Sequence, residues 1–480
     1  MIERIFPHVN TNIQAVLRRY GTVEDSDATV LLAPFIASKG PANTVQKVYS
    51  VTEFESIYGA IDFKTQGQSV ANIYNWLTNG GAVLALRLVG SDGEKAQGTL
   101  VTEGGSPETL LTATAEHEGT YYNDIKLQFR KSSVGTMIDV RVLLSGRIIQ
   151  TVSRLDSNSF VRVLNSLGLV NIDVPNFEAF YNYLTASWTD VELTGGADSD
   201  SSLDDLVIEF FEGEATTVLG NKLDTSIDVF LDFGLSTAAK EAVATFTTEE
   251  EGSIRRNDFM VFFDTKNFIV GEDSSLGNLG WNHAVYDQTL TVNNLLTNGN
   301  NEEVTATYAL ANLLPFNDRT YGVQWPTAGQ TRGVIRGITQ VSSNPNDTEK
   351  ALNYSNRLNY IEKDARGYYF MSQLTRDEAS SEGYRTALAF VNNARTTLKM
   401  VKELEILGRQ YLFEFNDSAT LKNMSNALNR YVNEWIQKRA LSEGNVIVEK
   451  NPFSDEKVDV TLTIKFTGII EIVSINLVIE

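Results

Sequence analysis

The sequence predicts an α/β protein that carries a β-rich insertion and ends in an α+β region. Three patterns support this class. A buried strand, a helix and a second buried strand follow one another between residues 29 and 89. Residues 91–195 change to short strands, and residues 385–466 hold two long amphipathic helices followed by an alternating strand. The order strand, helix, strand favours a parallel sheet, whereas a run of strands favours a separate β-rich unit.

The first unit begins with Thr29–Ile36, an apolar run typical of a buried strand. Lys39-Gly40-Pro41 ends this strand, because glycine and proline interrupt regular structure. Helical spacing of apolar residues predicts a helix over Gln68–Thr78, and Asn79-Gly80-Gly81 stops it. Ala82–Val89 is the second buried strand, which completes a βαβ unit.

The β-rich unit begins after the stretch 90–107, which is rich in Gly, Ser and Thr. Ile125–Phe129 and Met137–Leu143 alternate as strands, and Asn176–Ala186 is helical in pattern. Thr194–Ser202 forms a flexible boundary. After residue 203 the α/β signals return, with predicted strands at Ile227–Phe233 and Asp258–Phe263 and a helix at Thr237–Phe246.

The C-terminal region has the strongest periodicity. Arg385–Leu407 is a predicted helix whose apolar face holds Leu388, Val391, Ala394, Leu398 and Val401. Asp417 or Ser418 can cap the next helix, Leu421–Leu441. Its expected buried stripe is Leu421, Met424, Leu428, Val432 and Trp435. Two alternating runs predict strands, Val458–Phe466 and the run of Val473, Ile475, Leu477 and Ile479.

These patterns divide the 480 residues into six expected segments. They are an N-terminal extended arm (1–20), the first part of the α/β core (21–90), a β-rich inserted domain (91–195), the second part of the core (196–345), a C-terminal α+β domain (346–468) and a C-terminal arm strand (469–480).

Composition and charge argue against several functions. Acidic residues outnumber basic ones by 61 to 40, a net charge of −21, which disfavours binding to nucleic acid or to an anionic membrane surface. The chain has no cysteine, so disulfides, thiolate nucleophiles and cysteine-ligated zinc are excluded. The N-terminus lacks a signal-peptide pattern, and no apolar run approaches the ~18 residues of a membrane span. We expect the chain to be made and used in the cytoplasm, or in an assembly that leaves by lysis.

Motifs for catalysis are missing. His8, His117 and His283 are far apart, and no G-x-S-x-G elbow accompanies them. A triad can assemble in space, but structural histidines are the simpler expectation. Neither G-x-G-x-x-G nor a phosphate-binding P-loop occurs, and no cofactor is implied.

Two charged stretches have a structural and a functional interpretation. The cluster of Asp198, Asp200, Asp204 and Asp205 lacks the glycine and glutamate of a calcium loop, so a solvated linker is expected and a cation site is the alternative. Thr247–Glu251 with Arg255 and Arg256 reads as a solvated face, and a salt-bridge patch to a neighbouring subunit is the alternative.

Several stretches in the first half of the chain match one family in order. Lys39-Gly40-Pro41-Ala42-Asn43, Val51-Thr52-Glu53-Phe54, Tyr58-Gly59 and Asn79-Gly80-Gly81 leading to Arg87 resemble the G-P-x-N, E-F, F-G and N-G-G…R elements of the phage tail sheath family. Glu118–Ile125 resembles its G-x-W-G-N segment. Leu193-Thr194-Gly195-Gly196-Ala197-Asp198 resembles its L-x-G-G-x-D-G segment, with Ser199 in place of glycine.

The second half continues the resemblance. Gln324-Trp325-Pro326-Thr327-Ala328-Gly329 is similar to the W-x-A-P-A-G turn, displaced by one residue. Tyr411–Thr420, which contains Asn416 and Asp417, is similar to Y-x-F-E-P-N-D-x-x-T, with Phe415 replacing proline. The start of the chain and residues 340–380 match only faintly.

The resemblance implies a subtilisin-like α/β core without the catalytic triad, a β-sandwich or barrel-like insert that projects outward, and a C-terminal domain that faces a tube. It implies a structural subunit, not an enzyme, that polymerises with itself around a tail tube. Partners would be the tube, baseplate and tail terminator proteins, and the location would be the virion tail, after assembly in the host cytoplasm. Contraction would drive the tube through the host cell envelope for genome ejection.

The resemblance also implies that the terminal arms add strands to the sheets of neighbouring subunits. Val473, Ile475, Leu477 and Ile479 permit this; otherwise they complete the sheet of their own domain. Tube contact is expected on the Leu421–Leu441 helix, through Lys422, Arg430, Lys438 and Arg439, and a solvated helix face is the alternative. Reversing Lys438 and Arg439 to Glu should weaken sheath–tube association.

Two other functions remain open from the sequence. One is the sheath of a phage-derived injection particle or bacteriocin, whose subunits would assemble and contract in the same way. The other is an α/β hydrolase-like enzyme, which would need a pocket that joins Ser, His and Asp.

Overall fold

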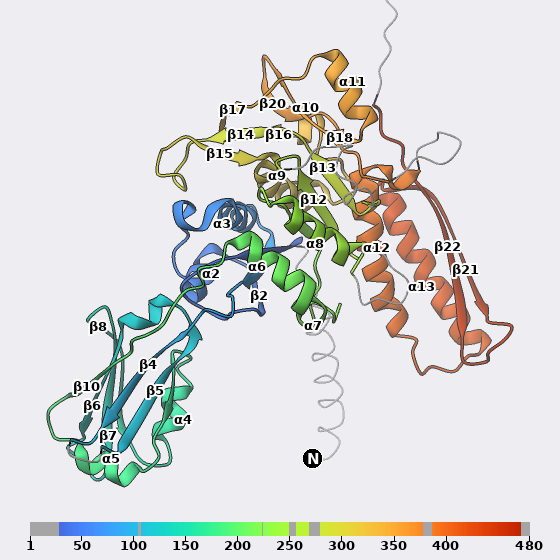
Figure 1. Ribbon diagram of the computed structural model, residues 1–480. Coiled ribbons are helices and arrows are strands. Elements are labelled where there is room, and N and C mark those ends of the chain that lie inside the picture. Colours follow the sequence, from blue (N-terminus) through green and yellow to red (C-terminus); the bar gives the residue numbers. More distant parts are fainter. Residues whose placement is uncertain are drawn as a thin grey trace, which may run out of the picture.

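The computed structural model describes residues 28–103, 107–222, 224–248, 256–267, 279–377 and 386–471. Figure 1 shows an α/β core from which a β-rich unit projects on one side and a unit of two long helices and a hairpin on the other. Among the described residues, no helix combines the length and the apolar character that crossing a membrane requires.

The core is built on a seven-stranded sheet in the order β18-β13-β12-β11-β1-β3-β2. All neighbouring pairs are parallel except β2–β3, which is antiparallel. The strands are β1 (Val30–Phe35), β2 (Val45–Val48), β3 (Ala82–Arg87), β11 (Val229–Leu231), β12 (Met260–Asp264), β13 (His283–Tyr286) and β18 (Leu358–Asn359). The predicted α/β class is confirmed.

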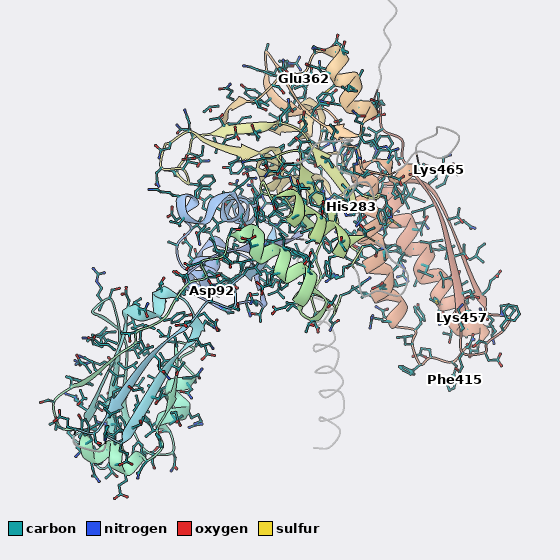
Figure 2. All side chains as sticks on the ribbon, in the orientation of Figure 1. Asp92, His283, Glu362, Phe415, Lys457 and Lys465 are labelled. Atoms are coloured by element: carbon teal, nitrogen blue, oxygen red, sulfur yellow. The ribbon has the colours of Figure 1, made fainter. Side chains whose placement is uncertain are left out.

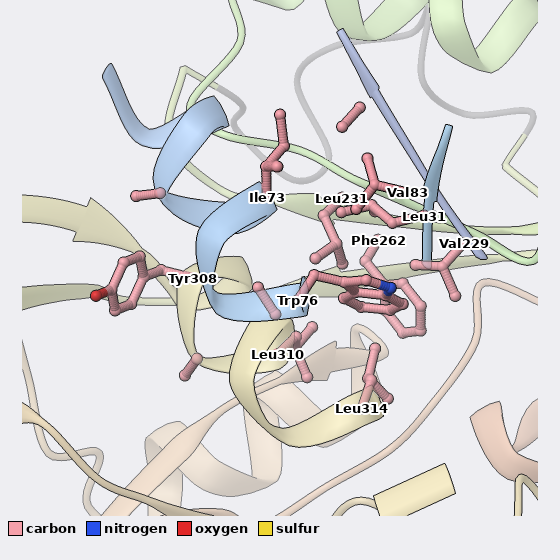
Figure 3. Close-up of a cluster of buried hydrophobic side chains, with 14 of the residues drawn as sticks. Leu31, Ile73, Trp76, Val83, Val229, Leu231, Phe262, Tyr308, Leu310 and Leu314 are labelled. Atoms are coloured by element: carbon pink, nitrogen blue, oxygen red, sulfur yellow. The ribbon is translucent and has the colours of Figure 1, made fainter. Parts of the chain in front are cut away.

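Helices cover both faces of this sheet, which is why its strands read as continuous apolar runs. Along β1, Leu31 and Phe35 join one hydrophobic cluster while Val30 and Leu32 join the other. On the first face, α3 (Phe63–Thr78) packs with α9 (Ala306–Tyr321), and Figure 3 shows Trp76, Leu310 and Leu314 beside the sheet residues Val229 and Phe262. The core also contains α2 (Val51–Tyr58), α6 (Leu203–Glu209), a π-helical turn (Phe210–Glu214), α7 (Ala215–Val218) and α8 (Thr237–Thr247).

Two small sheets extend the core. One has the order β15-β14-β17 and the other β16-β20-β19. Their elements are β14 (Thr289–Val292), β15 (Glu302–Thr305), α10 (Gly329–Arg332), β16 (Val334–Ile335), β17 (Ile338–Val341), α11 (Asp347–Ser355), β19 (Ile361–Asp364) and β20 (Gly367–Phe370).

The β-rich unit contains a four-stranded sheet, β10-β6-β7-β8, and a three-stranded sheet, β4-β5-β9. Both sheets and two helices contribute to one hydrophobic cluster, and neither sheet closes into a barrel. The elements are β4 (Lys95–Val101), β5 (Thr109–Glu118), a 3-10 turn (Thr120–Asp124), β6 (Ile125–Lys131), β7 (Ile138–Leu144), β8 (Arg147–Leu155), α4 (Phe160–Asn165), β9 (Val170–Asp173), α5 (Phe177–Tyr183) and β10 (Thr189–Glu192).

The C-terminal unit consists of a 3-10 turn (Ala387–Ala389), α12 (Val391–Arg409), α13 (Ser418–Gln437) and an antiparallel hairpin of β21 (Leu441–Lys450) and β22 (Val458–Phe466). The hairpin lies along α13, and Figure 1 shows both at one side of the molecule. A separate cluster of Met400, Val432, Trp435, Ala440 and Leu441 forms its core.

Several sequence-based expectations need correction. Val401 is 44% exposed because the apolar face of α12 leaves the core after Leu398. Leu388 lies in the 3-10 turn before α12 rather than on it, and α13 ends at Gln437, so Leu441 starts a strand. Arg256 is buried, not solvated, because its guanidinium pairs with Asp258.

One strand crosses an expected domain boundary. β18 is an edge strand of the central sheet, although residues 346–468 were expected to form the C-terminal domain. Residues 358–359 therefore lie with the core.

Candidate assembly interface

The two histidines in the described part of the chain, His117 and His283, lie in different units and do not meet. His283 is buried on β13, where its ring stacks on Phe263 and its Nε2 lies 2.9 Å from the Thr247 hydroxyl. Burial lowers the pKa of His283 to about 3, so this imidazole is neutral. His117 lies half-buried on β5, and His8 is outside the described residues. In the described ranges no three metal-ligating side chains gather at one point.

The predicted acidic cluster is dispersed into local hydrogen bonds. Asp198 accepts from the backbone N–H and the hydroxyl of Thr120, at 3.1 and 2.6 Å. Asp204 accepts from the Ser236 N–H at 2.9 Å. Asp198 therefore fixes a turn where the β-rich unit joins the core, whereas Asp204 ties α6 to the start of α8 within the core.

Five motif glycines shape turns, and three of them, Gly40, Gly195 and Gly196, lie at that junction. Gly40, with φ +96°, accepts a 2.6 Å hydrogen bond from Arg87 through its carbonyl and precedes Pro41. Gly196 exchanges two 2.8 Å hydrogen bonds with the Asn123 side chain, and Gly195 has φ +81°. Gly80 and Gly81 follow α3, where a Cβ on Gly81 would lie 2.2 Å from the Trp76 indole nitrogen.

The β21–β22 hairpin is the feature best suited to joining copies of the chain. It is a two-stranded sheet, and both of its outer edges lack a partner strand among the described residues. Such edges present rows of backbone N–H and C=O groups that can pair with another chain. An isolated hairpin is also marginally stable, so added strands would stabilise it.

The open edge of β22 can be assigned residue by residue. The Thr467 N–H donates to the Ala440 carbonyl, and the Lys457 carbonyl accepts from the Asn451 N–H. The backbone N–H and C=O of one strand residue point to the same side. The backbone groups of the odd-numbered residues of β22 therefore face β21. The backbone groups of Val460, Leu462 and Ile464 therefore face the open edge.

The β-rich unit also has an exposed edge strand, β8, but this strand is less regular than β22. β8 pairs with β7 through two register irregularities, and Arg154 has φ +60°. Bulges of this kind prevent edge-to-edge pairing. The pairing of β21 with β22 has one irregularity, near Leu441, so β22 stays regular along its length.

The four predicted tube-facing residues occupy two places. Lys422 and Arg430 are exposed on α13. Lys438 follows the helix, with its ammonium 5.0 Å from the ring centroid of Trp435. Arg439 has φ +64° and its guanidinium lies 5.4 Å from the ring centroid of Trp325, so this basic pair lies where α13 meets the core.

The Tyr411–Thr420 motif forms the loop between α12 and α13. Asp417 caps α13 by accepting from the N–H groups of Ala419 and Thr420, as expected. Asn416 donates to the Asp455 carbonyl at 2.6 Å and ties this loop to the hairpin turn. Figure 2 shows Phe415 and Lys457 together at this far end of the unit.

The sequence did not single out two features of the helix–hairpin unit. It gave no reason to choose the backbone of β22 over other edges, although the alternation at Val458–Phe466 marked the strand. It also gave no signal that Arg439 and Trp325 would meet. The predicted arm residues Val473, Ile475, Leu477 and Ile479 lie outside the described residues.

Solved structures with a similar fold come from one kind of assembly. The sheath tail protein of Listeria innocua matches with a TM-score of 0.65 and 16% identity, over 92% of each chain. The chain has the fold of contractile sheath proteins. The sheath tail protein of Desulfitobacterium hafniense matches 92% of this chain and 96% of its own, with a TM-score of 0.54 and 14% identity.

A contracted helical sheath from the anti-feeding prophage also shares the sheath fold. It matches 95% of this chain and 94% of its own, with a TM-score of 0.55 and 13% identity. No protein-family model and no curated protein sequence matches the chain. The likeness establishes the fold, and function has to be argued from the surfaces.

Proposed function

We propose that this chain is the structural subunit of a contractile phage tail sheath. It polymerises around a tail tube and contracts to drive the tube through the host cell envelope for genome ejection. The observation that carries the proposal is the sheath fold, which spans 92% of the chain in the Listeria innocua match. The open β21–β22 hairpin supports it, because it offers the edge that strand addition requires.

The assembly follows from edge pairing. Terminal arms, including Val473, Ile475, Leu477 and Ile479, add to the hairpins of neighbouring copies and link the subunits into a mesh. Each contact is heterologous, so the polymer propagates. Contraction converts a metastable extended sheath into one in which the subunits share larger contact areas. No nucleotide or cofactor takes part.

The finer architecture is part of the proposal. The parallel sheet with helices on both faces supports a subtilisin-like core that has lost its triad, so the chain is not an enzyme. Residues 91–195 form the insert, a two-sheet sandwich that points outward. The C-terminal domain begins after β18 and β20 rather than at residue 346. The arms are residues 1–20 and 469–480.

The helix–hairpin unit faces the tube in this proposal. Its described part, residues 386–471, holds eleven basic and eleven acidic side chains, so the net charge of −21 resides elsewhere. The neutral unit can therefore approach another protein with less repulsion than the rest of the chain. Lys422 and Arg430, exposed on α13, are the better tube contacts, because Lys438 and Arg439 contact tryptophans.

The remaining partners and the location follow from the same role. The sheath would meet a baseplate at one end and a tail terminator at the other, and would belong to the virion tail after assembly in the host cytoplasm. The similarity to an anti-feeding prophage sheath favours one alternative, the sheath of a phage-derived injection particle.

A backbone substitution tests the hairpin edge without disturbing the hairpin itself. Val460→Pro removes an N–H that faces the open edge, and proline is tolerated at such edge positions. The monomer should fold normally but fail to polymerise, while Val460→Thr, which keeps the N–H, should polymerise. Deleting residues 469–480 should also abolish assembly. Sedimentation velocity measures both effects, and normal polymers of Val460→Pro would exclude this edge.

A further inference from the structure

The short segment Gly322–Pro326 connects the core to the helix–hairpin unit. It follows α9, whose last turn closes when the Gly322 N–H donates to the Asp318 carbonyl at 2.9 Å. Gly322 has φ +97°, and a Cβ there would lie 2.4 Å from the Gln324 side-chain oxygen. Glycine therefore lets the chain turn sharply out of the core at this point.

Gln324 reaches two elements of the C-terminal unit at once. Its carbonyl accepts from the Asn392 amide of α12 at 2.9 Å, and its side-chain amide donates to the Lys438 carbonyl at the end of α13 at 3.2 Å. The preceding Val323 packs against the cluster that contains Met400, Val432 and Trp435. Polar and apolar contacts thus both join the segment to the C-terminal unit.

Trp325 stacks with a guanidinium from each unit. Arg332 of α10, in the core, places its guanidinium carbon 4.5 Å from the indole centroid, and Arg439, just after α13, places its own at 5.4 Å. Arg332 also donates to the Pro326 carbonyl at 3.1 Å. Arg439 keeps a left-handed backbone, with φ +64°, which a non-glycine residue holds only when its surroundings favour it.

The C-terminal unit is also joined to the core by α12 and by the segment that follows β22. α12 is anchored in the core through Val391, Ala394 and Leu398. α13 contacts α12 through Tyr431, whose hydroxyl donates to Glu403 at 2.7 Å. The segment after β22 adds one hydrogen bond to the core, in which the Tyr354 hydroxyl of α11 donates to Glu471 at 2.8 Å. With only these connections α13 could still pivot about α12, whereas the attachment at Trp325 removes that freedom.

We propose that Gly322–Pro326 is a latch that holds α13 and the β21–β22 hairpin rigidly on the α/β core. Trp325 and Arg439 are its positioning residues. The use of the latch rests on the proposed sheath function: arms of neighbouring copies that pull on the hairpin would transmit their force to the core instead of swinging the hairpin. The basic pair Lys438 and Arg439 then serves the subunit itself and not the tube.

The test measures the position of the unit in the monomer. Because the chain has no cysteine, Lys64→Cys on α3 and Asn433→Cys on α13, both exposed, give one unique pair of spin labels. Electron–electron dipolar spectroscopy should show a single narrow distance distribution. Trp325→Ala should widen it at least twofold, and Trp325→Phe should restore it because an aromatic face remains.

A second variant keeps the test decisive if Trp325→Ala folds poorly. Arg439→Gly removes the stacked guanidinium and suits the left-handed backbone, so the monomer should fold well while the distribution still widens. Unchanged widths in Trp325→Ala and Arg439→Gly would overturn the latch. The spin-label distances are measured in the monomer. A failure of the chain to form sheaths would therefore refute the proposed function but would leave the result on the latch unaffected.

Discussion

Arg87 shows how one side chain can hold two units together. Its side chain is fully buried and donates to three carbonyls, those of Ala37 at 2.6 Å, Gly40 at 2.6 Å and Glu118 at 2.9 Å. The first two lie after β1 in the core and the third ends β5 in the β-rich unit. The sequence placed Arg87 at the end of a motif, but nothing in its spacing showed that the partners would be carbonyls.

Arg87→Lys should destabilise the protein by about 2 kcal/mol, because an ammonium cannot reach three separated carbonyls and each buried unpaired group is costly. Urea unfolding of both proteins measures the change. Arg147→Lys, on exposed β8, is the matched control and should change stability by less than about 0.5 kcal/mol. A loss for Arg87→Lys as small as the control's would show that the carbonyls do not need the guanidinium.

A buried group of three charges lies at the carboxyl ends of β11 and β12. The Lys240 ammonium is 2.8 Å from Asp264 and 3.0 Å from Asp232, and all three side chains are buried. Burial, reinforced by the Asp232 carboxylate, raises the pKa of Asp264 to about 7, although Lys240 opposes this. Sequence patterns marked the strands and not this group, because its members are far apart along the chain.

The raised pKa of Asp264 predicts a pH-dependent stability. An acid whose folded pKa exceeds its unfolded value stabilises the fold below that unfolded value, and this contribution is lost as pH rises toward 7. Relative to Asp264→Asn, which cannot titrate, the native protein should lose stability between pH 4 and 7, by at most about 1.4 kcal/mol per pH unit. Urea unfolding at pH 5 and pH 8 checks this. Parallel changes in both proteins would contradict it.

At the scale of elements, periodicity predicted the strongest features and missed the weakest. The strand–helix–strand order at β1, α3 and β3 and the alternation of β22 were read correctly, because burial on a fixed face imposes a period. β21 was not predicted, because Ser442-Glu443-Gly444-Asn445 reads as a loop. Its strand conformation depends on pairing with β22 and on packing against α13.

Gly444 allows that packing. A Cβ at this position would lie 2.3 Å from the nearer Val432 methyl carbon, so β21 approaches α13 through the glycine. Gly444→Val should push the hairpin off the helix and cost roughly 1–3 kcal/mol through overpacking. Hydrogen exchange should show faster exchange in β21 and β22 and unchanged protection in the central sheet.

The control for this prediction is Asn445→Val, an exposed neighbour whose side chain points away from the helix. It should leave hairpin exchange unchanged. Adding Val432→Ala to Gly444→Val should recover part of the hairpin protection, because it removes the methyl groups in the way. Hairpin protection that survives Gly444→Val would mean that the strand does not depend on this close approach.

Across the whole molecule, the net charge is distributed unevenly among the regions, and two of the regions project from different sides of the core. Residues 386–471 are neutral, whereas the rest of the chain carries the net charge of −21. Figure 1 places the β-rich unit and the helix–hairpin unit at separate sides of the core. In the proposed sheath, the neutral helix–hairpin unit would therefore be the side of the molecule that meets the tube. Pattern and order predicted the three regions, but the boundary near β18 depends on a two-residue strand that no periodicity reveals.

Cryo-electron microscopy of the concentrated chain would show whether the subunits polymerise through the open edge of β22. We expect hollow tubes or rings wider than ~100 Å, a size expected for several domains around a lumen, in which strands from neighbouring copies pair with the open edge of β22. A monodisperse monomer, even with tube protein added, or a polymer in which that edge stays unpaired, would contradict this expectation.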